Sequence, residues 1–256
     1  MSDRAAYDPN ANNPMGAAQA NMRPPVLKRF FKQVAIAEAD GGFALKLDGR
    51  SARTPGKAPL VAPRRAIAEY IAAEWDGQGE ILEPWTMPAT RLANSAIDGV
   101  AKTIRATRAE IAQYAGSDLV CYRSDQPPEL VAMQAAAHDP VLAFAHEAFG
   151  ARFVLAQGVM FVAQPREALE RIEGVVGRYE EPFAVAALHV LTSLSGSALI
   201  ALTLAHGGIK PEDAWRAAHV DEDFQIRKWG EDHEALKRRE ARWVEFAAAA
   251  KVIAAL

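Results

Sequence analysis

The feature that most constrains this sequence is a long stretch without formal charge. Between Pro182 and Gly208 there is no Asp, Glu, Lys or Arg, and a helix of that length could span a bilayer. Polar residues such as Thr192, Ser193 and Ser195 interrupt the stretch, and no cluster of basic residues anchors its ends. A helix that is apolar all round is also needed at the centre of a helical domain. We therefore expect a buried central helix and no stable membrane insertion, with a single-span membrane protein as the alternative.

The first part of the chain, residues 27–62, shows the patterning of strands. Phe43, Leu45 and Leu47 alternate with Ala, Lys and Asp, which is the period of two expected for a half-buried strand. Two Asp-Gly turns mark hairpins on either side of this strand. A sheet of so few strands is not stable on its own. We therefore expect a small antiparallel unit that packs on another element.

From Pro63 onward the apolar residues follow helical spacing. Ile67, Ile71 and Trp75 recur on one helical face. Farther along, the pair Asp139–Pro140 predicts a helix start, with aspartate as the cap and proline in the first turn. We expect helices to dominate from here to the end of the chain.

These patterns predict an α+β fold, in which a small antiparallel β N-terminal domain is followed by a larger, mostly α-helical C-terminal domain. We place the β-containing domain at residues 27–85 and the helical domain at residues 86–256. Residues 1–26 have no apolar run like that of a signal peptide and mix acidic residues with Pro, Asn, Gly and Ala. We expect this segment to be a disordered tail.

The charge balance argues against nucleic acid as a partner. The formal net charge is −3, with basic residues scattered among acidic ones, whereas a groove that follows phosphates needs concentrated Lys and Arg. Cys121 is the only cysteine, which excludes an intrachain disulfide and suits a reducing compartment. Its neighbours are apolar, so we expect a buried thiol rather than a nucleophile.

The sequence lacks the patterns that support catalysis. None of the six histidines belongs to a His-Glu-x-x-His motif, and no glycine-rich phosphate loop is present. The segment around Ser195 and Ser197 lies inside a helical pattern and departs from the Gly-x-Ser-x-Gly nucleophile elbow. We therefore predict no catalytic residue, no cofactor, no metal site and no enzymatic activity. The alternative is a hydrolase that uses Ser195 or Ser197, which would place one of these serines near a histidine.

A helix predicted to start at Pro211 carries an unusual carboxylate. Its successive residues turn by about 100°, so Glu222 would lie in the middle of an apolar stripe formed by Trp215, Ala218, Ile226 and Trp229. A buried carboxylate needs a partner to offset its desolvation. Either a basic residue of another helix pairs with Glu222, or the stripe is partly open and Glu222 meets a basic group on a binding partner. Phe224 lies on the opposite side and needs a second packing surface.

Several segments, in this order, resemble a family of assembly chaperones that hold the alpha subunit of the F-type ATP synthase. Each motif is short, but their ordered combination is specific, and the resemblance runs from about residue 28 to the C-terminus. The matching segments are Arg29–Lys32, Asp48–Pro55, Ala73–Asp76, Met87–Asp98, Ser117–Arg123, Leu191–Ser197 and Glu222–Gly230.

The resemblance implies a non-enzymatic chaperone that binds the unassembled alpha subunit and prevents its aggregation until the beta subunit replaces it. An acidic residue before the Gln-x-x-x-Trp-Gly motif is important in the family, and it matches Glu222. We expect Glu222, Asp223, Phe224 and Arg227 to bind the partner, and we expect a monomer in the bacterial cytoplasm. One departure is His138, because the family usually has Trp before Asp-Pro.

Overall fold

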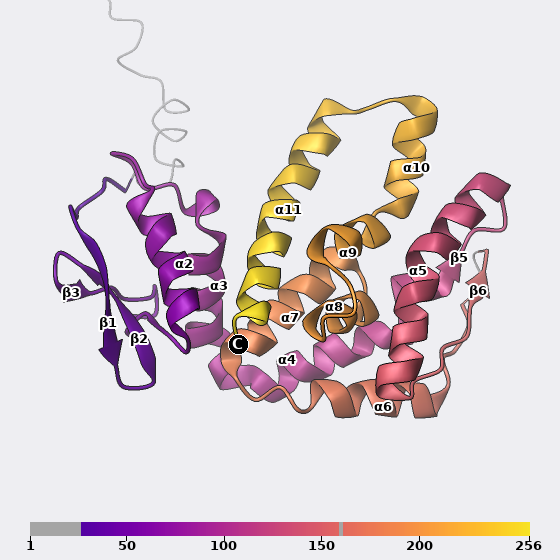
Figure 1. Cartoon of the computed structure of the whole chain (residues 1–256), viewed down its shortest axis with the longest axis horizontal. Helices are drawn as coiled ribbons and strands as arrows, with labels where there is room; N and C mark the ends of the chain where they lie inside the picture. Colours follow the sequence, from indigo (N-terminus) through magenta and orange to yellow (C-terminus); the bar gives the residue numbers. More distant parts are fainter. Residues whose placement is uncertain (1–26, 159–160) are drawn as a thin grey trace, which may run out of the picture.

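The computed structural model describes residues 27–158 and 161–256, so the tail predicted for residues 1–26 lies outside the described residues. The molecule is elongated, with a small β-sheet at one end and helices along the remainder (Figure 1). Antiparallel strands come first and helices follow, which confirms the predicted α+β class.

Four short strands form the sheet: β1 (Val34–Ala39), β2 (Gly42–Leu47), β3 (Arg50–Ser51) and β4 (Val61–Ala62). Strand β2 is central and pairs antiparallel with each of the others. The turn between β2 and β3 is made by Asp48 and Gly49, which have φ angles of 48° and 79°. A two-residue hairpin turn needs such left-handed residues, and Asp-Gly supplies them at low cost.

Helix α2 (Arg65–Asp76) packs on this sheet. Ile67 and Ile71 are buried against it, and Trp75 lies 5.6 Å from the Phe31 ring. The helix therefore provides the packing partner that the sheet requires. The predicted domain boundary between residues 85 and 86 stays a prediction, because α3 (Pro88–Ser95), just beyond it, contacts both α2 and helices of the larger part.

A mixed helical segment then crosses the molecule. It contains a 3₁₀ turn η1 (Pro84–Thr86), α3, a π-helical turn η2 (Ala96–Val100), α4 (Ala101–Gln113), two further 3₁₀ turns η3 (Tyr114–Ser117) and η4 (Leu119–Cys121), and the short strand β5 (Tyr122–Arg123).

Helix α5 (Pro128–Phe149) is continuous, so the helix start predicted at Asp139–Pro140 is wrong. The helix passes through Pro140, although a proline there removes one backbone hydrogen bond. Asp139 pairs with Arg123 at 2.8 Å and does not act as a cap. An Asp-Pro pair marks a first turn only where the residues before it are not already helical.

The charge-free stretch forms two helices, α7 (Pro182–Ser195) and α8 (Ala198–Ala205), rather than the single predicted helix. Gly196 separates them with a φ of 69°, the left-handed conformation that commonly ends a helix. Both helices are largely buried, as predicted for the centre of a helical domain. None of the helices in the described residues has the length and apolar character that a membrane crossing requires.

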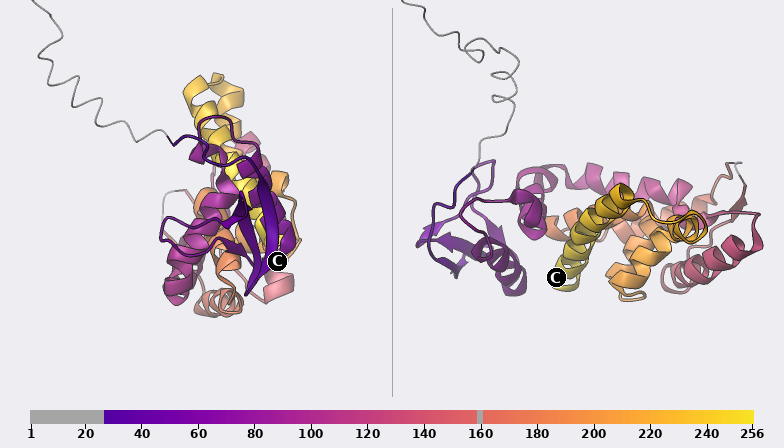
Figure 2. Two further views of the ribbon diagram at one scale, coloured as in Figure 1. Left: turned by 90° about the vertical axis from the view of Figure 1, so that its left-hand side faces the viewer. Right: turned by 90° about the horizontal axis from the view of Figure 1, so that it is seen from above.

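The remaining elements complete the helical part. They are β6 (Ala156–Gln157), which pairs parallel with β5, α6 (Arg166–Val176), α9 (Pro211–Ala218), α10 (Val220–Trp229) and α11 (His233–Ala254). Helix α11 packs along α7, and its N-terminal half extends away from the core, while α10 contacts α5. The connection between α10 and α11 projects beyond the other helices (Figure 2, left). We call α10, this connection and the N-terminal half of α11 the arm.

Candidate functional site

The arm begins at a break that the sequence pattern did not reveal. His219 has φ −124° and ψ 22°, so α9 ends there and α10 starts in a new direction. Helix α5 holds this elbow through two side chains. His138 Nε2 donates to the carbonyl of Ala217 at 2.9 Å, and Gln134 Nε2 donates to Asp221 Oδ1 at 2.7 Å. The residue at position 138, where the resemblance leads one to expect Trp, thus contributes a buried hydrogen bond to the elbow.

The predicted apolar stripe from Trp215 to Trp229 is therefore wrong. Its members belong to two helices with different directions, so they do not share one face. Trp215 is buried among Trp243 and Phe246, with ring centroids 5.6 and 5.2 Å away. Trp229, at the end of α10, is 77% exposed. Glu222 is also exposed rather than buried.

A hollow of about 290 Å³ lies between α10 and α11. Its lining from α10 includes Glu222, Ile226 and Trp229, and its lining from α11 includes Leu236. Asp232 also lines it and caps α11, because its Oδ1 accepts from the backbone N–H groups of residues 234 and 235. These backbone hydrogen bonds lower the pKa of Asp232, so this carboxyl is ionised at neutral pH. The hollow thus combines an apolar floor with carboxylates.

A second hollow of about 500 Å³ adjoins the first, and Leu236 and Arg239 line both. Trp215 and Trp243 supply its aromatic wall. Arg239 pairs with Asp223 at 2.6 Å and so connects α11 to α10. The two hollows together form one continuous face over α9, α10 and α11, which we call the arm face.

The four residues predicted to bind a partner have different environments. Glu222 lies on the rim of the first hollow, and within the described residues the ion pairs of α10 involve its neighbours Asp223 and Lys228 instead. Arg227 is exposed, with Nη1 3.5 Å from the sulfur of Met133. Phe224 is only 5% exposed, so in this conformation it offers a partner almost no surface. Their role in binding stays a prediction.

Sequence reasoning missed the contribution of α11 to this site. Asp232 and Leu236 reach the hollow only because the chain reverses after Trp229 and brings α11 beside α10. Gly230, with φ 89°, makes that reversal possible. The Trp-Gly pair at positions 229 and 230 was a visible signal for a helix end, but it did not indicate which side chains would face each other across the turn.

The serines of the hydrolase alternative have structural partners. Ser195 Oγ donates to the carbonyl of Leu191 at 2.7 Å, and Ser197 Oγ donates to the carboxylate of Asp118. Both serines are buried, and neither has a histidine among its hydrogen-bond partners in the described residues. Cys121 is buried as predicted, and burial raises the pKa of its thiol to about 12. In residues 27–158 and 161–256 no group of His, Cys, Asp and Glu side chains could hold a metal ion.

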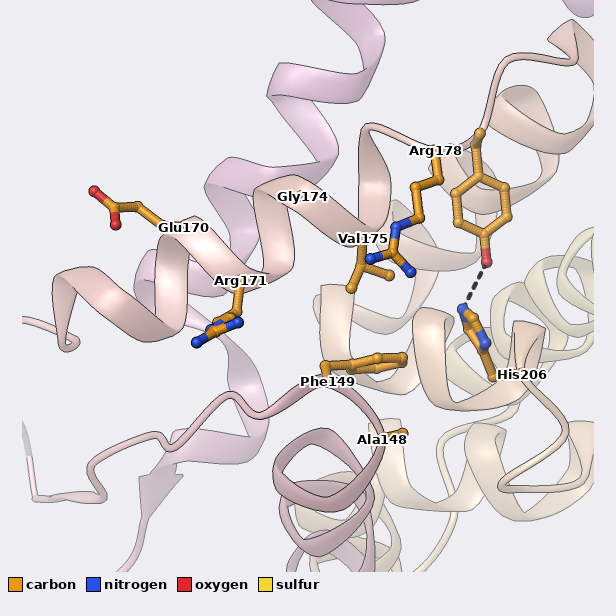
Figure 3. Close-up of a pocket in the computed structure, with 9 residues that line it drawn as sticks. Ala148, Phe149, Glu170, Arg171, Gly174, Val175, Arg178 and His206 are labelled. Atoms are coloured by element: carbon orange, nitrogen blue, oxygen red, sulfur yellow. Dashed lines mark hydrogen bonds between the residues drawn. The ribbon is translucent and has the colours of Figure 1, made fainter.

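A larger cavity of about 720 Å³ lies at the other side of the helical part, between α6 and the ends of α5 and α8. Its lining includes Glu170 and Arg171 of α6, and Arg178 just beyond the end of that helix, together with Phe149 (Figure 3). At its far end the Tyr179 hydroxyl lies 3.2 Å from His206 Nε2. The charged residues of this lining are one acid, Glu170, and two arginines, of which Arg171 pairs with Glu167 at 3.5 Å.

Comparisons with known proteins agree with one another. Residues 28–146 match the family model described as ATP12 chaperone protein. The Atu1473 protein from Agrobacterium tumefaciens, a candidate chaperone, is 46% identical with a TM-score of 0.87, and the match covers 96% of this chain and 92% of that one. Atp12 from Paracoccus denitrificans is 37% identical with a TM-score of 0.83, and the match covers 89% of this chain and 97% of that one. A point mutant of that Atp12 is similar to the same degree, at 36% identity.

Proposed function

This chain belongs to the ATP12 chaperone family, and on that premise we propose that it is an assembly chaperone of the F-type ATP synthase. In this proposal it binds the unassembled alpha subunit, prevents its aggregation, and releases it when the beta subunit takes its place. It acts as a monomer in the bacterial cytoplasm and catalyses no reaction. The basis for this partner is the ordered set of sequence motifs described above.

The physical need for such a chaperone is simple. A subunit that awaits assembly exposes the apolar surface of its future interface, and exposed surface of this kind aggregates. A stable cover requires about 800 Å² from each partner. Aromatic side chains suit the centre of such a cover, and charges near its rim provide specificity and faster encounter.

The observation that carries the proposal is the composition of the arm face. It presents the exposed indole of Trp229 and the partly buried side chains of Trp243 and Leu236 on a projecting part of the molecule. Glu222 lies beside them with an exposed carboxylate. Within the described residues, the ion pairs of α10 do not include Glu222. This supports the alternative in which Glu222 meets a basic group of the client over the one in which a basic residue of another helix pairs with it.

The test is a binding measurement between this chain and purified alpha subunit. We expect Glu222→Gln to weaken the complex about tenfold, which corresponds to the roughly 1.4 kcal/mol of one charge-assisted hydrogen bond. Circular dichroism and thermal unfolding should be unchanged, because Glu222 is exposed. Glu173→Gln, an exposed acid on α6 outside the arm face, is the matched control and should bind normally.

The same experiment distinguishes the competing accounts. Unfolding of Glu222→Gln would assign Glu222 an internal structural role. No complex between the unaltered chain and the alpha subunit would refute the proposed partner. Addition of beta subunit to the complex should release the chaperone, and a stable ternary complex would contradict the replacement step.

A further inference from the structure

We propose that the hollow between α10 and α11 is a receptor for one cationic side chain of the partner, with arginine preferred over lysine. The inference rests on the proposed function for the identity of the partner, but the chemistry of the hollow can be tested without it. Three features carry the inference: the charge balance of the lining, the exposed indole, and the shape of the hollow.

The charge balance favours a cation. Glu222 and Asp232 both line the hollow, and among the described residues the one basic side chain in its lining, Arg239, is already paired with Asp223 at 2.6 Å. Asp232 uses Oδ1 to cap α11, which leaves its second oxygen available to a ligand. An incoming guanidinium or ammonium group would therefore meet net negative charge in the described lining.

The indole supplies a second attraction of a different kind. Trp229 is 77% exposed although Trp is the aromatic ring with the strongest attraction for cations on its face. Glu222, Ile226 and Trp229 recur at positions i, i+4 and i+7 of α10, which places the carboxylate and the indole on one side of the helix. A planar guanidinium can stack on the ring while it pairs with a carboxylate, whereas an ammonium is a compact point charge.

The hollow also has room for the aliphatic part of such a side chain. Its volume of about 290 Å³ is many times the roughly 30 Å³ of one water molecule. Ile226, Ala235 and Leu236 give it an apolar floor, which suits the methylene stem of Arg or Lys. The second hollow shares Arg239 with the first. Apolar residues next to the bound cation in the partner's sequence would pack there against Trp215 and Trp243.

The cavity beside α6 differs in charge from the hollow between α10 and α11. Glu170, Arg171 and Arg178 line the cavity beside α6 (Figure 3), and Arg171 pairs with Glu167. With one acid against two arginines, this lining favours a cation less than the hollow between α10 and α11 does.

The chemistry of the hollow can be tested with small probes. N-acetyl-arginine amide should shift the indole N–H signal of Trp229 in NMR spectra of the full chain, at millimolar concentrations. N-acetyl-lysine amide should bind at least twofold more weakly, and N-acetyl-citrulline amide, the neutral isostere of the arginine probe, should produce no saturable shift. Equal binding of the citrulline and arginine probes would overturn the inference.

Variants connect the probe binding to the named residues. We expect at least threefold weaker binding of the arginine probe to Trp229→Ala and to Glu222→Gln. Because Trp229→Ala lacks the indole signal, its binding is followed on the backbone amide signals of α10. Trp85→Ala is the matched control, because Trp85 is 65% exposed but lies outside the arm. Unchanged affinity in both arm variants, or an equal loss in Trp85→Ala, would also overturn the inference.

Binding of the alpha subunit separates a failure of this inference from a failure of the proposed function. If the alpha subunit binds the unaltered chain and both arm variants equally well, the inference and the assignment of the arm face fail, whereas the alpha subunit stands as the partner. If the alpha subunit does not bind the unaltered chain but the arginine probe does, the partner is wrong and the cation receptor stands. The inference also predicts that salt weakens alpha-subunit binding less steeply in Glu222→Gln than in the unaltered chain.

Discussion

At the scale of single residues, the most consequential group in the core is the carboxylate of Asp118. It is 0% exposed and lies against the start of α8. It accepts hydrogen bonds from Ser197 Oγ and from the backbone N–H groups of Leu199, at 3.0 Å, and Val120, at 3.3 Å. Burial raises the pKa of Asp118 to about 6, while these hydrogen bonds act in the opposite direction. Asp118 thus fastens α8 to the chain that precedes β5.

This raised pKa predicts a pH dependence with a definite sign. Because the pKa rises from 3.8 in the unfolded chain to about 6 in the folded state, the folded state binds the proton more tightly. The associated stability is fully present below pH 3.8 and is lost as the pH rises through 6, with a size on the order of 3 kcal/mol. Urea unfolding from about pH 4 to about pH 7.5 should show the unaltered chain losing stability relative to Asp118→Asn, which cannot ionise.

The comparison with Asp118→Asn cancels the opposite contribution of the buried histidines, whose pKa values are lowered by burial. Asp118→Ala should be several kcal/mol less stable than Asp118→Asn, because it leaves three buried donors without an acceptor, at about 1–3 kcal/mol each. Parallel pH profiles for the unaltered chain and Asp118→Asn would contradict the assignment.

Residues in the resemblance motifs were visible in the sequence, but their partners were not. The Glu74 carboxylate accepts hydrogen bonds from the backbone N–H groups of Ala89 and Thr90 at the start of α3. It thereby joins the motif Ala73–Asp76 to the motif Met87–Asp98. Asp98 accepts a hydrogen bond from Thr54 Oγ1 at 2.7 Å and so joins the second of these motifs to a third, Asp48–Pro55. The motifs in this part of the chain therefore hold the fold together. Spacing along a sequence cannot reveal such bonds, because the paired residues come from separate elements.

At the scale of elements, helix starts were easier to predict than helix breaks. The starts of α2 and α9 lie at or just after Pro63 and Pro211, where the helical spacing of apolar residues begins. No glycine or proline marks the break at His219 in the sequence. Helix α5 holds the two helices at this break through His138 and Gln134. The break at Gly196 had a visible glycine, but the surrounding apolar residues also suited one long helix. Tertiary contacts decided both cases.

The position of α10 should depend on Phe224. Its ring is buried, α10 contacts α5, and Lys228 lies 5.7 Å from the ring and pairs with Glu129 of α5. We expect Phe224→Ala to destabilise this docking by about 3 kcal/mol, the low end for the loss of a buried Phe. Hydrogen exchange should become faster in residues 220–229, while α7 and α8 keep their protection.

The neighbouring exposed residue provides the control for this prediction. Gln225→Ala changes the same helix without altering its buried side and should leave exchange in α10 unchanged. Equal exchange in Phe224→Ala and Gln225→Ala would show that α10 is held by other contacts. If the prediction is correct, Phe224→Ala should also weaken alpha-subunit binding indirectly, by disordering the arm face.

At the scale of the whole molecule, the sheet and the arm have separate positions along an elongated body (Figure 2, right). The α+β class and the order of its two parts could be predicted from patterning, because periods of two and of about 3.6 residues are local properties. The arm face could not, because it requires the reversal at Gly230 and the Arg239–Asp223 pair across two helices. The sequence singled out Glu222, and the structure adds Trp229, Asp232 and Leu236 around it.

The central claim is that the arm face covers an aggregation-prone surface of the alpha subunit. Its most direct test is light scattering from purified alpha subunit at a temperature where that subunit aggregates alone. An equimolar amount of this chain should suppress the scattering, and the double variant Glu222→Gln/Trp229→Ala should suppress it far less while remaining folded. If the alpha subunit aggregates at the same rate with and without the unaltered chain, the account is contradicted.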